Sequence, residues 1–150
     1  MNHSNKTVCV VGASGLLGSN VLKEALARGY KVNGTLRDVN APGKATFLNA
    51  LPNAEANLRL FEAEMAEKAS FDDAFSNVDC VFIACLIPVY KGPTGKPARE
   101  MDNEQGYAEI IMPTVNGCLN IMNAAAKQKV KNVVICSSTS STNPIPPVPI

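Results

Sequence analysis

The sequence predicts an α/β fold built on a doubly wound parallel sheet of about five strands, with helices on both faces. Short apolar runs of strand length alternate along the chain with segments whose apolar residues recur every three or four positions. A glycine-rich turn separates the first such run from the first helical segment. No hairpin signal joins consecutive runs, and strands connected by helical crossovers pair in parallel.

The first half of the chain alternates regularly. The first helix has one apolar face, and Arg28 and Gly29 end it as a basic last turn and a glycine cap. The face is made by Leu16, Leu17, Val21, Leu22, Ala25 and Leu26. The predicted elements are strands over Thr7–Val11, Lys31–Leu36 and Asn57–Ala63, with a short helix over Lys44–Leu51 before Pro52.

The second half contains two further strands and a long helix. Ser70 is expected to cap a short helix, because acidic residues follow it in the first turn. Pro113 either kinks the long helix or marks the first position of its second part. The predicted elements are strands over Val78–Leu86 and Lys131–Cys136, a loop over Val89–Gly106, and a helix from Tyr107 to Ala125.

Composition narrows the function classes. The 150 residues suit one domain, and a net charge of +1 gives no electrostatic reason to expect nucleic acid or an anionic membrane as a partner. The longest apolar run, Val78–Val89, is shorter than the roughly 20 residues of a bilayer span. The N-terminus lacks the apolar segment of a signal peptide, so a cytoplasmic protein is expected.

Histidine and cysteine usage argues against metal chemistry. His3 is the only histidine, so histidine-based catalysis and a histidine-rich metal site are not expected. The five cysteines form no C-x-x-C pair, and no ligand cluster is visible. Four of them, Cys9, Cys80, Cys85 and Cys136, lie in apolar runs, where a reduced thiol behaves as a small apolar side chain.

The strongest local motif is the run Gly12-Ala13-Ser14-Gly15-Leu16-Leu17-Gly18, which leaves the first strand and opens the first helix. In this context the three glycines permit a tight turn, a close approach of backbone to a pyrophosphate, and close packing of helix on sheet. The helix N-terminus supplies N–H groups and positive dipole for the phosphates. The motif makes the sheet Rossmann-type, with Gly12, Ser14, Gly15, Leu16, Leu17 and Gly18 as candidate cofactor-binding residues.

The end of the second strand indicates which nicotinamide cofactor binds. An NAD site usually places an acid there for the ribose 2′-hydroxyl, whereas this chain has Arg37, whose planar guanidinium suits a 2′-phosphate. NADP is therefore the expected cofactor. Asp38 follows immediately, so NAD stays as the alternative, and a solvated surface arginine is the non-functional reading of Arg37.

The chain resembles an extended short-chain dehydrogenase/reductase, especially the dihydroflavonol reductase and cinnamoyl-CoA reductase-like branch. The resemblance rests on VCVVGASGLLGSNVLKEALARGYKVNGTLRD, NLRLFEAEMAEKASFDDAF, VDCVFIAC and PTVNGCLNIMNAAAKQKVKNVVICSSTS, which span most of residues 7–142. It implies that Lys44 joins Arg37 at the 2′-phosphate and that Glu64 and Met65 lie by the adenine. It also implies that Ala84, Cys85 and Leu86 border the nicotinamide ribose. A surface carboxylate and a buried thiol are equally good readings of Glu64 and Cys85.

The same resemblance implies a catalytic role for Ser138 at the end of the fifth strand, where it would orient a substrate carbonyl. Ser137, Ser140 and Ser141 are not excluded by the residues alone. The family's Tyr-x-x-x-Lys pair is missing, because Tyr30, Tyr90 and Tyr107 are followed four residues later by Gly34, Thr94 and Ile111.

The expected organisation is an incomplete NAD(P)-binding domain over residues 1–142 and a Pro-rich tail over residues 143–150. We expect the N-terminal, cofactor-binding portion of an NADP-dependent oxidoreductase that reduces a small-molecule carbonyl to an alcohol, inactive as this chain alone. A non-catalytic NADP-binding sensor or interaction module is the alternative, and a sugar-nucleotide epimerase is a weaker one. The sequence identifies neither the substrate nor the oligomeric state.

Overall fold

The computed structural model describes residues 5–85 and 91–138. Within them, five strands form one parallel sheet in the order β3-β2-β1-β4-β5. The predicted Rossmann-type parallel sheet is therefore confirmed. The strands are β1 (Thr7–Val11), β2 (Lys31–Leu36), β3 (Leu58–Glu62), β4 (Cys80–Ile83) and β5 (Asn132–Ile135).

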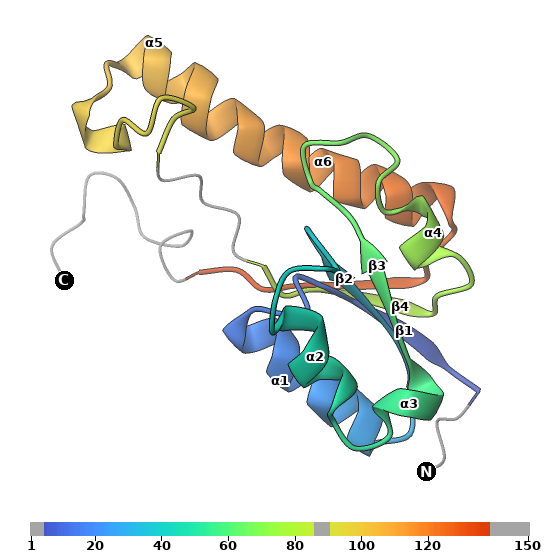
Figure 1. The fold of residues 1–150 in the computed structure, drawn as a ribbon. Helices are drawn as coiled ribbons and strands as arrows, with labels where there is room; N and C mark the ends of the chain where they lie inside the picture. Colours follow the sequence, from blue (N-terminus) through green and yellow to red (C-terminus); the bar gives the residue numbers. More distant parts are fainter. Residues whose placement is uncertain (1–4, 86–90, 139–150) are drawn as a thin grey trace, which may run out of the picture.

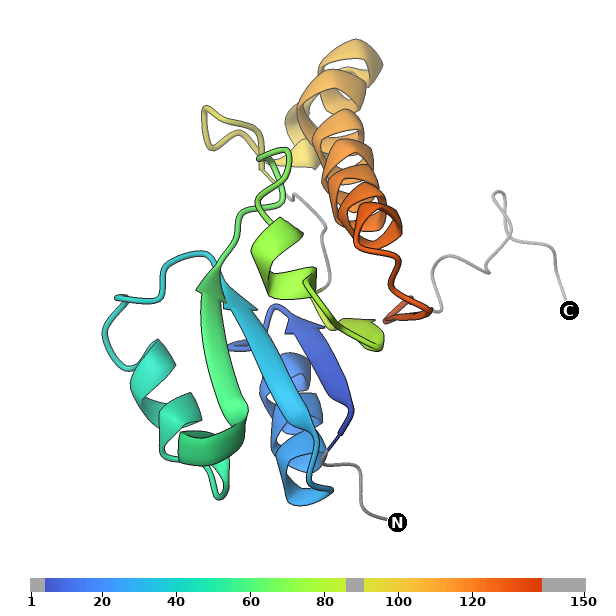
Figure 2. The ribbon, with the colours of Figure 1, turned by 90° about the vertical axis from the view of Figure 1, so that its right-hand side faces the viewer.

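The helices form a layer on each face of the sheet (Figure 1, Figure 2). One layer holds α1 (Leu16–Ala27), α2 (Lys44–Asn49) and α3 (Ala54–Asn57), and the other holds α4 (Asp72–Phe75) and α6 (Met112–Lys127). Right-handed crossovers explain this division, because the chain moves outward from β1 to β3 and then back across to β4 and β5. The strands of this parallel sheet carry apolar side chains on both faces, so each face needs a layer of helices to cover it.

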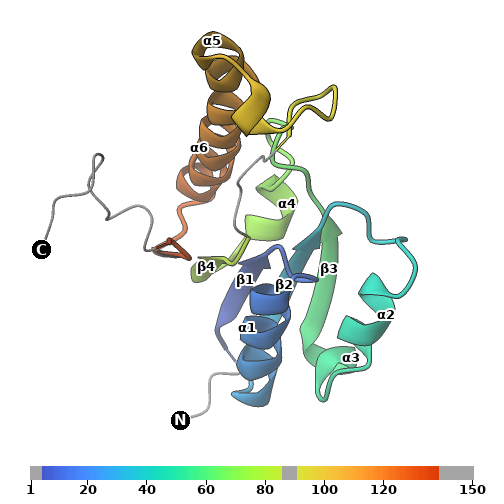
Figure 3. The same cartoon turned by 90° about the vertical axis from the view of Figure 1, so that its left-hand side faces the viewer.

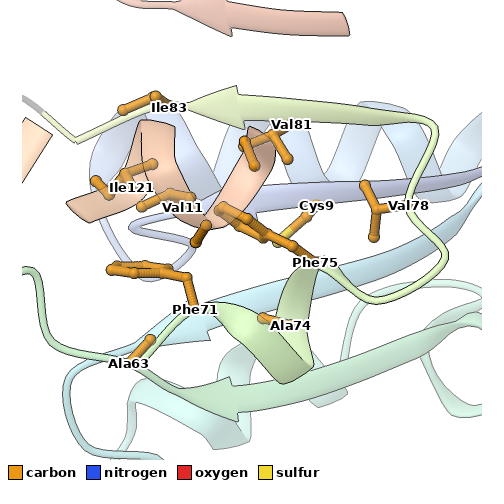
Figure 4. Close-up of a cluster of buried hydrophobic side chains, with 12 residues drawn as sticks. Cys9, Val11, Ala63, Phe71, Ala74, Phe75, Val78, Val81, Ile83 and Ile121 are labelled. Atoms are coloured by element: carbon orange, nitrogen blue, oxygen red, sulfur yellow. The ribbon is translucent and has the colours of Figure 1, made fainter. Parts of the chain in front are cut away.

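Each layer covers its own core. Alternate residues of β1 point to opposite faces, so Cys9 packs under α4 and α6 whereas Val10 packs under α1. On the α4 and α6 face the fully buried rings of Phe71 and Phe75 lie 5.5 Å apart between centroids, beside Ile121 of α6 (Figure 4). On the other face the core includes Val10, Leu22, Leu26, Val32, Leu36 and Leu48.

The region between β4 and α6 differs from its prediction as a loop. It contains the single turn η1 (Ala98–Glu100) and the helix α5 (Asn103–Gly106), whose N-cap Asp102 accepts a hydrogen bond from the Gln105 amide. A π-helical turn, η2 (Tyr107–Ile111), then leads into α6. The sequence gives little signal for η1 and α5, because elements of three and four residues are too short to show a helical period, and of the two only α5 has a side-chain cap. Residues 86–90, which include the last residue of the predicted fourth strand and the start of the predicted loop, lie outside the described residues.

At the starts of the helices, the structure corrects the predicted cap, adds a helix that the sequence did not predict, and places Pro113. Ser70 is not a helix cap, because its hydroxyl accepts a hydrogen bond from the Glu64 amide at 2.7 Å and Phe71 occupies the N-cap position of α4. Helix α3, which the sequence did not predict, begins after Asn53 in the left-handed conformation (φ 67°). Pro113 is the second residue of α6, directly after the π-helical turn η2, so it lies near the start of the second part of that helix but not at its first position. No helix within the described ranges is long and apolar enough to cross a bilayer.

Candidate functional site

The glycine turn lies against the tip of β4. Gly12 has a φ of +78°, a left-handed conformation that side chains rarely adopt. A Cβ added there would lie 2.8 Å from Cβ of Cys85, the residue two positions after β4. The structure therefore brings together two segments that the sequence predicts to border one cofactor.

The turn closes tightly on itself before α1 begins. The Gly15 amide donates to the Gly12 carbonyl at 3.0 Å. A Cβ on Gly18 would lie 2.1 Å from that same carbonyl oxygen, and a Cβ on Gly15 would lie 3.3 Å from it. Gly18 thus allows the first turn of α1 to lie directly on the backbone of Gly12, as the motif predicts.

The N-terminus of α1 is open for an anion. Its N-cap residue is Gly15 in an extended conformation, no side chain caps it, and its first turn contains no acid. Backbone N–H groups and the positive end of the helix dipole at such a terminus favour negative charge. Leu16 is 87% exposed and Leu17 is 44% exposed beside this terminus, and Ser14 is half-buried in the turn.

Thr35 positions the turn, and the sequence analysis did not select it. Its buried hydroxyl accepts a hydrogen bond from the Gly12 amide at 3.3 Å, and its carbonyl accepts one from the Ala13 amide at 3.0 Å. Next to it, a Cβ on Gly34 would lie 3.0 Å from Cβ of Ala13. The sequence signal that could have identified Thr35 is a small residue followed by a threonine at the end of the second strand.

Arg37 follows β2 and is exposed. The neighbouring Asp38 is engaged locally, since its carboxylate accepts a hydrogen bond from the Asn40 amide at 2.7 Å. Two successive turns, Ala41 N–H to the Asp38 carbonyl and Lys44 N–H to the Ala41 carbonyl, lead back to the start of α2. They place Lys44, exposed at the first position of α2, one short loop away from Arg37.

Glu64 and Met65 follow β3 and are both half-buried. The Met65 carbonyl accepts a hydrogen bond from the Asn120 amide group of α6 at 2.8 Å, which ties the β3 tip to the opposite helical layer. The Met65 side chain packs at Gly117 of α6, where an added Cβ would lie 2.5 Å from its terminal methyl. This segment is therefore held against α6 by a hydrogen bond to its backbone and by the packing of the Met65 side chain.

Ala84 and Cys85 follow β4 and are half-buried, whereas Leu86 lies outside the described residues. Burial, and to a lesser degree the nearby Cys118 and Cys136 thiols, raises the pKa of the Cys85 thiol. A neutral thiol packed against Gly12 fits the reading of Cys85 as a small apolar side chain. Within residues 5–85 and 91–138 no three His, Cys, Asp or Glu side chains are grouped to hold a metal ion.

Ser138 is exposed and lies beyond the end of β5. The Cys136 amide donates to the Ile83 carbonyl at 3.0 Å, so the pairing of β5 with β4 continues to that point. Ser138 is thus carried past the same sheet edge as Gly12, Arg37 and Cys85. Ser140, Ser141 and the Pro-rich tail over residues 143–150 lie outside the described residues. Figure 3 shows the fold from the side at which these strand ends lie.

Comparison with known proteins gives concordant matches. A family model described as NAD(P)H-binding matches residues 12–149. Dihydroflavonol 4-reductase of Arabidopsis thaliana is 39% identical over 144 residues, which cover 95% of this chain and 35% of that protein. The same enzyme of Dianthus caryophyllus is 38% identical over 138 residues, which cover 92% of this chain and 35% of that protein.

Solved structures agree with these matches. Vestitone reductase from alfalfa (Medicago sativa) superposes with a TM-score of 0.65 at 32% identity, over 89% of this chain and 36% of that one. Gre2 from Candida albicans, in complex with NADPH, superposes with a TM-score of 0.64 at 26% identity, over 90% of this chain and 38% of that one. The chain therefore belongs to the NAD(P)H-binding family and resembles its dihydroflavonol reductase-like extended short-chain dehydrogenases/reductases, spanning 35% of the length of the two curated relatives named above.

Proposed function

We propose that this chain binds NADP(H) at the carboxyl edge of its sheet and is the cofactor-binding portion of a carbonyl reductase of the dihydroflavonol reductase type. The observation that carries the proposal is the glycine turn. Its carbonyl at Gly12 fills the space that a Cβ on Gly18 would need, and the α1 terminus beside it has no side-chain cap. A backbone cradle of this kind, next to open N–H groups, suits a pyrophosphate.

The proposal assigns the adenosine end to residues after β2 and β3. Arg37 and Lys44 would bind the ribose 2′-phosphate, while Glu64 and Met65 would lie beside the adenine. The Asp38 carboxylate accepts a hydrogen bond from the Asn40 amide through one oxygen, and its second oxygen keeps its acceptor capacity, so this contact does not choose between the two cofactors. Arg37 at the end of β2 supports NADP over NAD, because a guanidinium suits a 2′-phosphate whereas an NAD site usually places an acid there.

The nicotinamide end would lie beside Ala84, Cys85 and Leu86, with Ser138 nearby. NADPH supplies a hydride to the carbonyl carbon when it is bound. Ser138 would donate a hydrogen bond to the carbonyl oxygen and orient it. Reduction also needs a proton at that oxygen from a group of suitable pKa. None of the three tyrosines is followed four residues later by a lysine, so we expect no turnover by this chain alone.

The proposal is tested by titrating the purified chain with NADPH and with NADH, following cofactor fluorescence or heat. We expect weak but measurable binding that favours NADPH. Arg37→Ala should weaken NADPH binding by about tenfold or more, the loss typical of a hydrogen bond to a charged group, and should leave NADH binding unchanged. Arg59→Ala, at an exposed arginine in β3, is the matched control and should change neither affinity.

Equal loss of NADPH and NADH binding in Arg37→Ala would overturn the assignment of the 2′-phosphate site. A folded chain that binds neither cofactor would overturn the whole proposal. A second candidate is a non-catalytic NADP-binding sensor, a function that needs no Tyr-x-x-x-Lys pair among these 150 residues. A reading frame that encodes such a pair after Ser138 would decide for the reductase, and a stable natural product of this length that binds NADPH would decide for the sensor.

A further inference from the structure

The segment that follows β3 forms a turn that closes on itself. The Glu64 amide donates to the Ser70 hydroxyl at 2.7 Å, and the Glu64 carbonyl accepts a hydrogen bond from the Glu67 amide at 3.1 Å. Both contacts are local, so they set the shape of the turn but not its position over the sheet. That position depends on contacts with residues far away in the sequence.

Asn120 of α6 supplies such a contact. Its side-chain amide donates to the Met65 carbonyl at 2.8 Å, across 55 positions of sequence. One turn earlier in α6, a Cβ added to Gly117 would lie 3.3 Å from Cβ of Met65, so the helix lies close to that side chain as well. In Figure 1 and Figure 2 the segment after β3 rises from the sheet to lie beside α6. A polar contact and a packing contact with one helix therefore fix the Met65 backbone.

The fixed backbone presents a hydrogen-bond donor next to an acceptor. The amides of Ala63 and Glu64 are both engaged within the fold, whereas the Met65 amide donates to no residue within 5–85 and 91–138. Over the same ranges the Glu64 carboxylate has neither a hydrogen bond nor an ion pair. An ionised carboxylate only accepts and a backbone N–H only donates. Together they complement a ligand edge in which a donor lies beside an acceptor.

Adenine has an edge of this kind. Its 6-amino group donates and its N1 accepts, whereas hypoxanthine presents the reverse, an oxygen at position 6 beside an N1–H. The inference below rests on the proposed function, which places the adenine of the cofactor beside Glu64 and Met65. A site tells the two bases apart only if its donor and acceptor are held in place, because polar groups left unpaired by the wrong base are what reject it.

We propose that Asn120 is a positioning residue for the adenine end of the cofactor. By holding the Met65 carbonyl, it fixes the Met65 amide and the Glu64 carboxylate for adenine and against a base with the reverse edge. Asn120 touches no atom of the cofactor and acts through Met65. The 2′-phosphate is assigned to Arg37 and Lys44, which lie after β2 and at the start of α2. Selection of the base is therefore separate from selection between NADP and NAD.

The test compares the binding of NADPH and of its hypoxanthine analogue, in which oxygen replaces the 6-amino group, to the purified chain. Both contain the dihydronicotinamide, so one fluorescence titration follows both. We expect the chain to bind NADPH more tightly than the analogue. Asn120→Ala should weaken NADPH binding by about fivefold, the loss typical of one hydrogen bond, and should bring the two affinities closer together. The ratio of the NADPH and NADH affinities should stay unchanged.

Asn123→Ala is the matched control. Asn123 is an exposed asparagine of the same helix, without a hydrogen-bond partner among the described residues, so its variant should leave both affinities unchanged. Alanine is the best helix former, which keeps α6 intact in both variants. Asn120→Asp is a second variant that keeps the shape of the side chain but replaces the donor by an acceptor. It should also lose selectivity between the bases, whereas Asn123→Asp should keep it.

The outcomes separate this inference from the proposed function. A folded chain that binds neither NADPH nor the analogue would overturn both. A chain that binds NADPH but holds the analogue equally well would overturn only the role of Asn120. The same conclusion follows if Asn120→Ala lowers the urea midpoint of unfolding while its selectivity between the bases stays that of the original chain, since Asn120 then supports only the fold. An equal loss of selectivity in Asn123→Ala would also overturn the proposal.

Discussion

The two edges of the sheet are built differently. Strand β3 contains the charged residues Arg59 and Glu62, and its apolar side chains Leu58 and Leu60 pack into the core that α2 and α3 help to close. Strand β5 contains no charged residue, and Val134 and Ile135 are about half exposed. Charged residues and covering helices are the usual protection of a sheet edge. The β3 edge has that protection, whereas none of the residues that the structure describes gives it to the β5 edge.

The faces beside these edges differ in the same way. Around β1, β2 and β3, helices α1 to α3 bury a continuous core. Around β4 and β5, a groove of about 710 Å³ opens on the α1 face, and on the other face α6 exposes the apolar side chains of Val115, Leu119 and Met122. Among the described residues, the half of the fold that carries the glycine turn is therefore covered by its own helices, whereas the β4–β5 half leaves more apolar surface exposed.

The largest expected effect comes from a matched pair of leucine truncations. Leu22→Ala removes a fully buried side chain from the closed half and should cost about 2–5 kcal/mol of unfolding free energy. Leu119→Ala truncates a side chain that is 51% exposed and should cost less than about 1 kcal/mol. Urea unfolding of dilute protein measures both. Equal losses of unfolding free energy in the two variants would contradict the difference in packing between the two halves of the fold.

A pair of glycine substitutions tests the role of the glycine turn between β1 and α1. Gly18→Ala forces a Cβ to within 2.1 Å of the Gly12 carbonyl, so the turn must shift. We expect a loss of about 1–3 kcal/mol, as for overpacked sites, together with loss of NADP(H) binding. Gly29 has a φ of +81° and open space around it. Gly29→Ala should therefore lower the unfolding free energy by about 1 kcal/mol, because alanine disfavours the left-handed conformation, and should keep cofactor binding. Retained binding in Gly18→Ala would contradict the proposed phosphate cradle.

The smallest expected effect comes from the ion pair between Lys6 and Asp79, directly before β4. The Lys6 ammonium, 2.8 Å from the Asp79 carboxylate, and then the Thr7 amide hold the pKa of Asp79 below its usual value. A carboxyl whose pKa is lower in the folded state stabilises the fold above its unfolded pKa, near 3.9, and loses that contribution as pH falls through the folded value.

Asp79→Asn should therefore flatten the dependence of stability on pH below about pH 4. The change should be small, because exposed ion pairs contribute little. Lys6→Ala should flatten the same part of the profile to a lesser degree, since the Thr7 amide remains. Acid unfolding followed by circular dichroism measures both, and an unaltered profile in Asp79→Asn would contradict this role for the pair.

Much of the fold could be predicted because its signals are local. The β1 and β2 bounds follow from short apolar runs, and α1 follows from one apolar face that ends at Gly29. One error occurs where a side chain had two possible partners, and others where an element is only three or four residues long, as in α3 and α5. Ser70 has the composition of a cap, yet its hydroxyl is used by the Glu64 amide, which only the folded chain brings near.

By itself the sequence determined the sheet, its glycine turn and the residues expected at the carboxyl edge, because period, turn chemistry and motif spacing are carried by neighbouring residues. Only the tertiary structure decided what those residues contact. The Thr35 hydroxyl at the end of β2 accepts a hydrogen bond from the Gly12 amide after β1, Asp38 accepts one from Asn40 within its own loop, and α6 leaves apolar side chains such as Leu119 exposed. Such facts depend on distances between segments far apart in the chain, which local patterns do not encode.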